Sequence, residues 1–472
     1  MIWDIAYIII FVVYIYTIFT TIIFMLVENR NPVKSIAWIM VLIFLPVIGF
    51  LFYILVGRKF RKRHVISKRS LLINKKNNTS DLTELPKLNL TDEQRSIATL
   101  AYKNSDAPIH ENNKVDIITK ADQLYESIIN DLREAKHHIH MEYYIFLADK
   151  IGSQVMDVLK EKAKEGVAVR VIIDDVGSWQ LKKKKINELR EAGIEVQSFL
   201  EVGLPYINSR VNYRNHRKII VIDGLVGYTG GFNIADRYVE GLSWGPWRDT
   251  HIRIEGSAVL GLQKNFLMDW FFVKRELIED TAYYPAQEKK GDCLAQIVIS
   301  GPDMVWESVM QIFAKAFMEA KERIYIETPY FLPPESLITA LQTAALCGVD
   351  VRLILPMKSD ARVTLYSTYS YLDQMLKAGI KVYLYQPGFI HSKIVVADDI
   401  AIIGSANMDF RSFEQNFELN AIMYDATIAQ KMIDIYHDDL RSSIEVKKEE
   451  WATRRFSQKI KESLARLFSP LL

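Results

Sequence analysis

The chain has 472 residues, of which 49% are hydrophobic, and its formal net charge is +2. This length is too great for one ordinary domain, and the near-neutral charge argues against a polyelectrolyte surface for nucleic acid. Cys293 and Cys347 are the two cysteines, and neither lies in a CxxC pair. We therefore expect two or three folded units in a reducing compartment, without a disulfide scaffold or zinc ribbon.

Two long apolar runs lie within the first sixty residues. Residues 5–27 and 36–56 contain no charged side chain, and each run is long enough to cross a bilayer as a helix. Asp4 precedes the first run where a signal peptide would carry positive charge. Pro46 interrupts the second run, but proline is tolerated in membrane helices. The sequence therefore predicts a transmembrane helical hairpin over residues 1–60.

Basic residues after the second run predict how the chain is oriented. RKFRKR at 58–63 places five cations in six positions. The positive-inside rule therefore predicts a multi-pass protein of the cell membrane with its large C-terminal part in the cytoplasm. The same cations would attract anionic lipid at roughly 1 kcal/mol each. Residues 61–95 are polar, and we interpret them as a linker.

Most of the remaining chain consists of one pattern repeated twice. Four blocks recur in the same order: AKHHIHMEYYIF and AKERIYIETPYF, GVAVRVII and GVDVRLIL, LREAGIEV and MLKAGIKV, and HRKIIVID and HSKIVVAD. Helical and strand patterns alternate in each copy, which is typical of an α/β sheet covered by helices. We predict an α/β fold with two pseudo-symmetric units, residues 96–290 and 291–450, packed around one active site.

A motif with the pattern H-x-K-x4-D closes each repeat. Its residues are His216, Lys218 and Asp223 in the first copy and His391, Lys393 and Asp398 in the second. The β-branched residues after each lysine predict a buried strand, on which the histidine and lysine share a face. Buried cations need an anionic partner, and a phosphate is one. The pattern thus indicates a phosphate-handling site with two imidazoles and two ammonium groups.

Polar residues that follow each motif are candidates to support this site. They are Gly231, Asn233 and Asp249 after the first motif and Ser405, Asn407 and Glu418 after the second. Glycine allows the backbone to approach an oxyanion, and an asparagine amide can donate to a phosphate oxygen. Asp249 and Glu418 are expected to accept the second N–H of an imidazole, which fixes its tautomer.

The doubled motif with GSxN-like segments resembles the phospholipase D superfamily. RNPVKSIAWIMVLIFLPVIGFLFYILVGRKF, YRNHRKIIVIDGLVGYTGGFNIADRY and NMDFRSFEQNFELN resemble bacterial-type cardiolipin synthases within it. Gly231 departs from the pattern, because serine usually occupies that position of the first motif. The resemblance covers essentially the whole chain and is weakest in the linker.

The resemblance implies transfer of a phosphatidyl group between two phosphatidylglycerols, without a metal or other cofactor. One histidine forms a phosphohistidine, and the other protonates the departing glycerol and then activates the acceptor hydroxyl. By analogy His216 is the nucleophile and His391 the acid and base. Lys218, Lys393, Asn233 and Asn407 would stabilise the phosphoryl oxygens. The expected partners are phosphatidylglycerol and anionic membrane lipid, not nucleic acid.

Several alternatives remain open at this stage. A hydrolase of the same fold, such as a phospholipase that releases phosphatidic acid, would differ only in admitting water to the phosphohistidine. A non-enzymatic membrane scaffold is disfavoured by two complete motifs. His137, His138 and His140 suggest a metal site, but acidic or cysteine partners at ligand spacing do not accompany them. Residues 451–472 predict an amphipathic helix that packs on the core or lies on the membrane.

Overall fold

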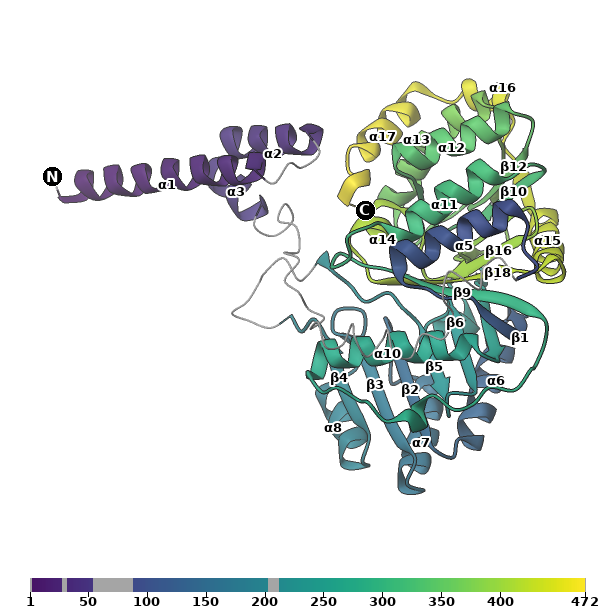
Figure 1. Ribbon diagram of the computed structural model, residues 1–472. Helices are drawn as coiled ribbons and strands as arrows, with labels where there is room; N and C mark the ends of the chain where they lie inside the picture. The colour runs from purple at the N-terminus through teal and green to yellow at the C-terminus, as the bar shows by residue number, and fades with distance from the viewer. Residues whose placement is uncertain (1, 28–31, 54–87, 203–211, 472) are drawn as a thin grey trace. The chain divides into compact units, whose positions relative to one another are not determined.

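The computed structural model describes residues 2–27, 32–53, 88–202 and 212–471 (Figure 1). Internal contacts divide the chain into two compact units. The first comprises Met1–Arg61 with Val202–Tyr213, and the second comprises Lys62–Glu201 with Arg214–Leu472. We call them the N-terminal unit and the catalytic unit.

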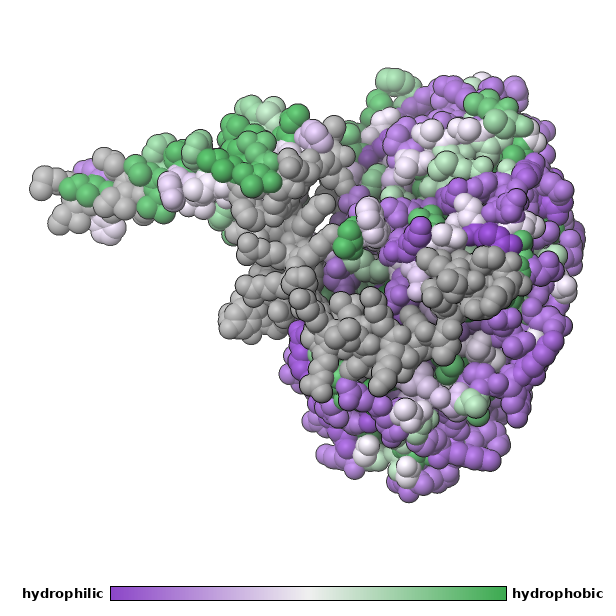
Figure 2. Space-filling view, viewed as in Figure 1, coloured by the Kyte–Doolittle hydropathy of each residue, from purple (hydrophilic) through white to green (hydrophobic). Residues whose placement is uncertain are grey.

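The N-terminal unit contains three apolar helices. They are α1 (Ile2–Val27), α2 (Pro32–Phe44) and α3 (Pro46–Phe52). Met25, Leu42 and Tyr53 form a small buried cluster between them. Many other large apolar side chains on these helices are exposed, and Figure 2 shows this apolar surface in green.

The prediction of a two-span transmembrane hairpin over residues 1–60 is wrong. Within the described ranges, none of the helices has both the length and the apolar character that a membrane span requires. The second apolar run is divided at Leu45, before Pro46, into helices of 13 and 7 residues. At about 1.5 Å per residue these reach about 20 Å and 10 Å, short of a hydrocarbon core of about 30 Å.

The divided run has a local cause, because a proline cannot continue the hydrogen-bond ladder of a preceding helix. The multi-pass topology inferred from two spans therefore has no support in the structure. The basic cluster at 58–63 and most of the predicted linker at 61–95 lie outside the described residues.

One continuous 15-stranded sheet forms the centre of the catalytic unit. The strands of its first half are β1 (His110–Ile118), β2 (His138–Tyr143), β3 (Ala168–Asp174), β4 (Glu195–Phe199), β5 (Ile219–Ile222), β6 (Val226–Gly230) and β8 (His251–Glu255). Those of its second half are β9 (Cys293–Ser300), β10 (Arg323–Glu327), β12 (Asp350–Pro356), β13 (Lys381–Tyr385), β15 (Ile394–Ala397), β16 (Ile400–Gly404), β18 (Glu418–Tyr424) and β19 (Ser443–Glu445).

The strand order shows that the two halves are copies of one unit. Outward from the centre, β1-β8-β6-β5-β2-β3-β4 mirrors β9-β18-β16-β15-β10-β12-β13, and β1 pairs with β9 in antiparallel fashion at the junction. In each half three neighbouring strands run parallel: β2, β3 and β4 in the first, and β10, β12 and β13 in the second. The strand after the motif lysine, β5 or β15, pairs antiparallel with both of its neighbours. The predicted α/β fold of two repeated units is therefore present.

Helices cover both faces of this sheet (Figure 1). They are α5 (Asp92–Ser105), α6 (Ala121–Glu134), α7 (Lys150–Lys164), α8 (Lys183–Glu191), α9 (Arg237–Glu240) and α10 (Ala258–Lys274), then α11 (Ser308–Glu319), α12 (Glu335–Leu346), α13 (Arg362–Lys377), α14 (Phe410–Glu414), α15 (Ala426–Arg441), α16 (Lys448–Ala452) and α17 (Phe456–Arg466). Side-chain caps set several starts: Thr91 and Gln94 form a capping box at α5, and Asp149 accepts from Gly152 at α7. Each half of the sheet packs its own buried hydrophobic core, so the site between the halves rests on two rigid supports.

Two short pairings join the halves near the motif strands. β7 (Trp247–Arg248) of the first half pairs in parallel with β14 (Phe389–Ile390) of the second. A bridge between Asn215 and Phe417 makes the reciprocal connection. The residues just before each motif histidine therefore contact the opposite half.

His138 and His140 lie on β2, His137 directly precedes it, and the three rings contact one another in sequence. The rings of His138 and His140 are fully buried, and both hydrogen-bond to Gln263 of α10 at 3.2 Å. His140 also stacks on Phe266 and Tyr283. Among the described residues no group of three or more histidine, cysteine, aspartate or glutamate side chains is arranged to hold a metal ion. His138 and His140 thus belong to the core, whereas His137 is exposed.

This cluster predicts a loss of stability in acid. Burial lowers the pKa of His138 to about 4, whereas an unfolded histidine has a pKa of about 6.5. Between these values the unfolded chain binds a proton that the folded chain does not, so the free energy of unfolding should fall as pH drops through this window and stay level above it. Urea unfolding at pH 7.5, 6 and 5 measures the slope. His138→Gln should reduce this slope, and an unchanged slope in that variant contradicts this account.

Candidate active site

The two motif histidines and lysines lie just before paired strands at the centre of each half. His216 and Lys218 precede β5, and His391 and Lys393 precede β15. All four are at least 92% buried, with Lys218 fully buried. The strands IIVI and IVVA that follow are buried on both faces, which fixes the direction of the motif side chains.

Each imidazole is held by a carboxylate from the other half. Nδ1 of His216 lies 3.0 Å from both carboxylate oxygens of Glu418, the first residue of β18. Nδ1 of His391 lies 2.7 Å from Oδ2 of Asp249, which stands between β7 and β8. Glu418 and Asp249 are both fully buried. Each half therefore supplies the carboxylate that holds the histidine of the other half.

Both lysines are buried next to their own histidines. Nζ of Lys218 donates to the carbonyl oxygen of His216 at 2.7 Å and lies 5.7 Å from the ring centre of Tyr144. Nζ of Lys393 lies 2.8 Å from Nδ1 of His391. Burial lowers the pKa of Lys218 to about 7 and that of Lys393 to about 8. Glu418 and Asp249 raise the pKa of both lysines in part, and the charge of Lys393 lowers the pKa of Lys218 further. An arriving phosphate would compensate these charges.

Burial and neighbouring charges also shift the pKa values of the imidazoles and the carboxylates. Burial, then the charge of Lys393, lowers the pKa of His391 to about 4, and burial also lowers the pKa of His216. Burial opposes ionisation of Glu418, but His216 and Lys218 outweigh it and lower the pKa of Glu418. Lys393 and His391 likewise outweigh burial and lower the pKa of Asp249. The resting site thus favours neutral imidazoles beside ionised carboxylates, which suits a histidine that attacks phosphorus.

Ser405 and Gly231 occupy equivalent positions of the two repeats, but Ser405 hydrogen-bonds to Glu418 whereas Gly231 leaves space for Asp249. The hydroxyl of Ser405 donates to Glu418 and accepts from the backbone N–H of Leu419 at 2.9 Å. At Gly231 a Cβ atom would lie 1.8 Å from Oδ1 of Asp249. Aspartate is shorter than the glutamate at the equivalent position 418, so the carboxylate of Asp249 lies against the backbone of residue 231. A side chain at residue 231 would collide with it, and Asp249 therefore requires Gly231, which departs from the family pattern.

Replacing this glycine should disable the site. In Gly231→Ala the new methyl group displaces Asp249, so we expect kcat/KM to fall by about 10²-fold or more, as when an orienting carboxylate is lost. Gly193→Ala is the matched control, because a Cβ there meets nothing within 4 Å and costs only backbone strain of about 1 kcal/mol. Lipid turnover by both purified variants checks this. Wild-type activity in Gly231→Ala would contradict it.

The two asparagines are engaged within the protein. Asn233 donates from Nδ2 to the hydroxyl of Tyr238 at 2.6 Å and accepts from the backbone N–H of Ile145 at 3.1 Å. The side chain of Asn407 hydrogen-bonds to Asp409, whose pKa burial raises to about 6. Asn233 therefore fixes the loop after β6 against the end of β2.

The aspartates of the motifs lie at the other end of their strands. Asp223 accepts from the backbone N–H groups of Lys136, His137 and His138 at 2.8 to 2.9 Å. Asp398 accepts in the same way from residues 321–323. Six residues of extended chain, four of them in the strand, separate each aspartate from its histidine, a span of about 20 Å. The structure therefore places Asp223 and Asp398 outside the reaction site, where they anchor β2 and β10 beside the motif strands.

Two buried glutamates next to the motifs were missed from the sequence. Glu142 on β2 accepts from Nδ2 of Asn215, and Oε2 of Glu327 on β10 lies 3.8 Å from Nη2 of Arg248. Burial raises the pKa of each well above the ordinary value. The signal was available, because both glutamates occupy the same position of the repeated AK blocks.

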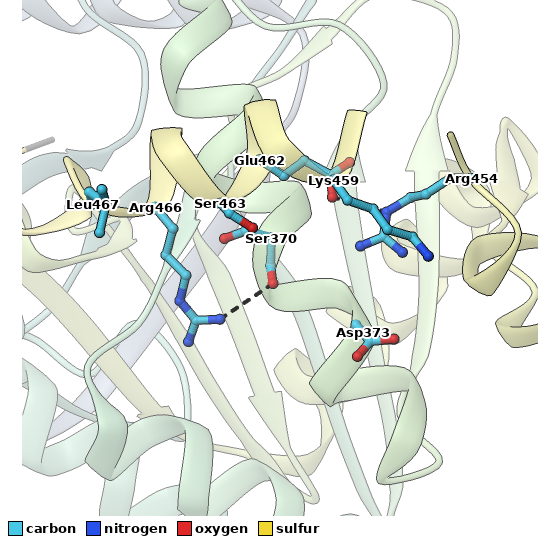
Figure 3. A pocket seen from close by; sticks show the side chains of 8 residues that line it. All are labelled: Ser370, Asp373, Arg454, Lys459, Glu462, Ser463, Arg466 and Leu467. Carbon is cyan, nitrogen blue, oxygen red and sulfur yellow. Dashed lines mark hydrogen bonds and ion pairs between the residues drawn. The ribbon is translucent and has the colours of Figure 1, made fainter. Parts of the chain in front are cut away.

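A pocket of about 440 Å³ lies elsewhere, between α13 and α17 (Figure 3). Its lining comprises Ser370, Asp373, Arg454, Lys459, Glu462, Ser463, Arg466 and Leu467. None of these belongs to either motif, and the paired histidines, lysines and carboxylates remain the candidate active site.

Comparison with known proteins finds similar sequences along most of the chain. The family model described as "Cardiolipin synthase, PLD-like domain" matches residues 128–259 and 313–440, and the model described as "Phospholipase_D-nuclease N-terminal" matches residues 8–58. "Cardiolipin synthase 2" of Bacillus cereus is 42% identical over 94% of this chain and 88% of its own. "Major cardiolipin synthase ClsA" of Bacillus subtilis is 42% identical over 97% and 98%. Phosphatidylserine synthase of Haemophilus influenzae, with a TM-score of 0.59 and 15% identity over 80% of this chain and 98% of its own, shares the fold.

Proposed function

The chain belongs to the cardiolipin synthase family of phospholipase D-like phosphatidyltransferases, and from this membership we propose that it joins two phosphatidylglycerols into cardiolipin and releases glycerol. The observation that supports this most is the exchange of carboxylates between the two histidines. It places a carboxylate acceptor on Nδ1 of each imidazole, so we assign the attack to Nε2 of His216, while Nε2 of His391 lies 3.3 Å from Nζ of Lys393.

In the first step, Nε2 of His216 attacks the phosphorus of one phosphatidylglycerol. The bond from phosphorus to the glycerol oxygen breaks, and His391 in its protonated form gives that oxygen a proton. The products are a phosphatidyl-histidine and free glycerol. Lys218 and Lys393 compensate the negative charge of the phosphoryl oxygens, and the anion in turn raises the pKa of His391 toward protonation.

In the second step, the primary hydroxyl of another phosphatidylglycerol gives its proton to His391. Its oxygen attacks the phosphorus, the P–N bond to His216 breaks, and cardiolipin leaves. The proton returned to His391 resets the site. Ammonium groups supply the charge in both steps, so the proposed reaction needs no metal.

Both substrates are lipids, and the exposed apolar side chains of α1 to α3 suit a protein that associates with the membrane in which those lipids lie. Association also favours transfer over hydrolysis, because acceptor lipid is concentrated at the surface and the second step becomes effectively intramolecular.

The test is to incubate purified protein with phosphatidylglycerol alone, with and without EDTA, and to measure lipids and free glycerol. We expect one glycerol for each cardiolipin, little phosphatidic acid and no effect of EDTA. Phosphatidic acid as the main product would make the protein a phospholipase. Cardiolipin that forms only after CDP-diacylglycerol is added would refute the donor and the phosphohistidine step.

A further inference from the structure

Helix α17 presents its apolar face to solvent. Phe456, Ile460, Leu464, Leu467 and Phe468 follow one helical stripe and are 77%, 43%, 56%, 74% and 53% exposed. Glu462 and Ala465 on the opposite side are only 1% and 7% exposed. A surface helix ordinarily turns its apolar stripe toward the core, so α17 has the reverse orientation.

Specific contacts fix this orientation. Glu462 accepts from Nε of Arg454 and from Nε2 of Gln458, each at 2.9 Å. The guanidinium of Arg466 lies 4.3 Å from the ring centre of Tyr371 on α13. The polar side of α17 is therefore the side bound to the catalytic unit, and the apolar side is left for another partner.

Cations border the exposed face. At 3.6 residues per turn, Lys461 falls beside one border of the stripe, Lys459 lies between the other border and the buried side, and Arg466 lies closer to α13. Lys459 and Arg466 also line the pocket of about 440 Å³, in which Figure 3 shows Lys459 beside Arg454 and Arg466 pointing toward Ser370. Arg454 is paired with Glu462, whereas the ion pairs found among the described residues include neither Lys459 nor Arg466. The carboxylates of Asp373 and Glu462 also line the pocket, but Asp373 pairs with Lys377 and Glu462 with Arg454, so the lining keeps a small excess of positive charge.

We propose that α17 docks the catalytic unit on an anionic phospholipid surface, with the pocket receiving a headgroup phosphate. An apolar stripe bordered by lysine and arginine is the pattern of a helix that lies in the membrane interface. The long basic side chains reach headgroup level while the stripe enters the acyl boundary.

The charges favour this partner over a second copy of the chain. A second copy placed on α17 would bring the same cations against each other, while anionic lipid brings the opposite charge to both borders. The proposal concerns binding, goes beyond the proposed function and does not depend on which lipid reaction the active site performs.

A fluorescent reporter on the face tests this in the full chain. Cys293 is buried and Cys347 exposed, so Cys347→Ser with Leu464→Cys provides one reactive thiol for an environment-sensitive nitrobenzoxadiazole label. The label reports on α17 itself, whatever else binds the membrane. Glu161→Cys in the same background, on exposed α7, is the control site.

We expect a blue shift of the label at 464 on vesicles of phosphatidylcholine with 30% phosphatidylglycerol, and none on phosphatidylcholine alone or at position 161. Lys459→Gln should weaken the response to anionic vesicles by about fivefold, the effect of one cation near the surface. A shift of equal size on both kinds of vesicle, no shift at all, or a shift that grows with protein concentration without lipid would each overturn the proposal. The last of these would identify a second copy as the partner.

Discussion

Replacing either His216 or His391 by alanine is expected to lower kcat/KM by at least about 10³-fold while the fold is retained. Each variant removes a group that the proposed reaction cannot replace: the nucleophile in one case, and the proton donor and acceptor in the other. The circular dichroism spectrum should not change, since both side chains face the site rather than either hydrophobic core. Lipid turnover by the purified variants measures the effect.

The two variants should differ in what they accumulate. If His216 is the nucleophile, His391→Ala can still form some phosphatidyl-histidine but resolves it slowly, so acyl-labelled lipid should remain with the denatured protein. His216→Ala should trap none. His437→Ala is the control, because His437 lies on α15 against Tyr325 and outside the site. Substantial activity in either motif variant would mean that the two motifs do not form one site.

The repeat made most of the catalytic fold predictable. Four matched blocks predicted two α/β units, because strands and helices in both copies follow the same hydrophobic pattern. The motif strands were predictable for the same reason: IIVI and IVVA are β-branched, and each is buried on both faces. The edge-to-edge joining of β1 and β9 was not predictable, since pairing between distant strands leaves no local signal.

The N-terminal prediction failed at a single residue. Hydropathy treated residues 36–56 as one segment, but Pro46 lacks the N–H that would continue the helix, and α2 ends at Phe44. Tolerance of proline in membrane helices depends on neighbouring groups that satisfy the freed carbonyls, and a hydropathy pattern carries no information about such neighbours.

The spacing of residues in the sequence predicts some contacts in the site and not others. A strand alternation places His216 and Lys218 on one face, so their proximity is a local property of the sequence. Asp223 lies in the same motif, but six intervening residues that include β5 carry it away from the histidine to the backbone at the start of β2. Motif membership and contact with the reacting atoms are therefore different properties.

The carboxylates of Glu418 and Asp249 each come from the half opposite the histidine that they hold. The site depends on these long-range contacts most, and removing either charge should lower the activity. Glu418→Gln and Asp249→Asn keep the shape of each side chain but remove the charge that holds Nδ1 of His216 or His391. We expect kcat/KM to fall by about 10²- to 10⁴-fold in each variant, the range found when the orienting acid of a catalytic histidine is replaced by its amide.

The pH profile distinguishes this electrostatic role from a purely structural one. Glu418 raises the pKa of His216 against the larger effect of burial. Without the carboxylate, the pKa of His216 must fall further, so the imidazole stays neutral to lower pH and the acid limb of kcat/KM governed by His216 should move to lower pH. Asp438→Asn, in an exposed pair with Arg441, is the matched control and should change neither the rate nor the profile. A rate loss in Glu418→Gln with an unmoved acid limb would indicate that Glu418 only packs against the imidazole, because a neutral amide would then serve its structural purpose equally well.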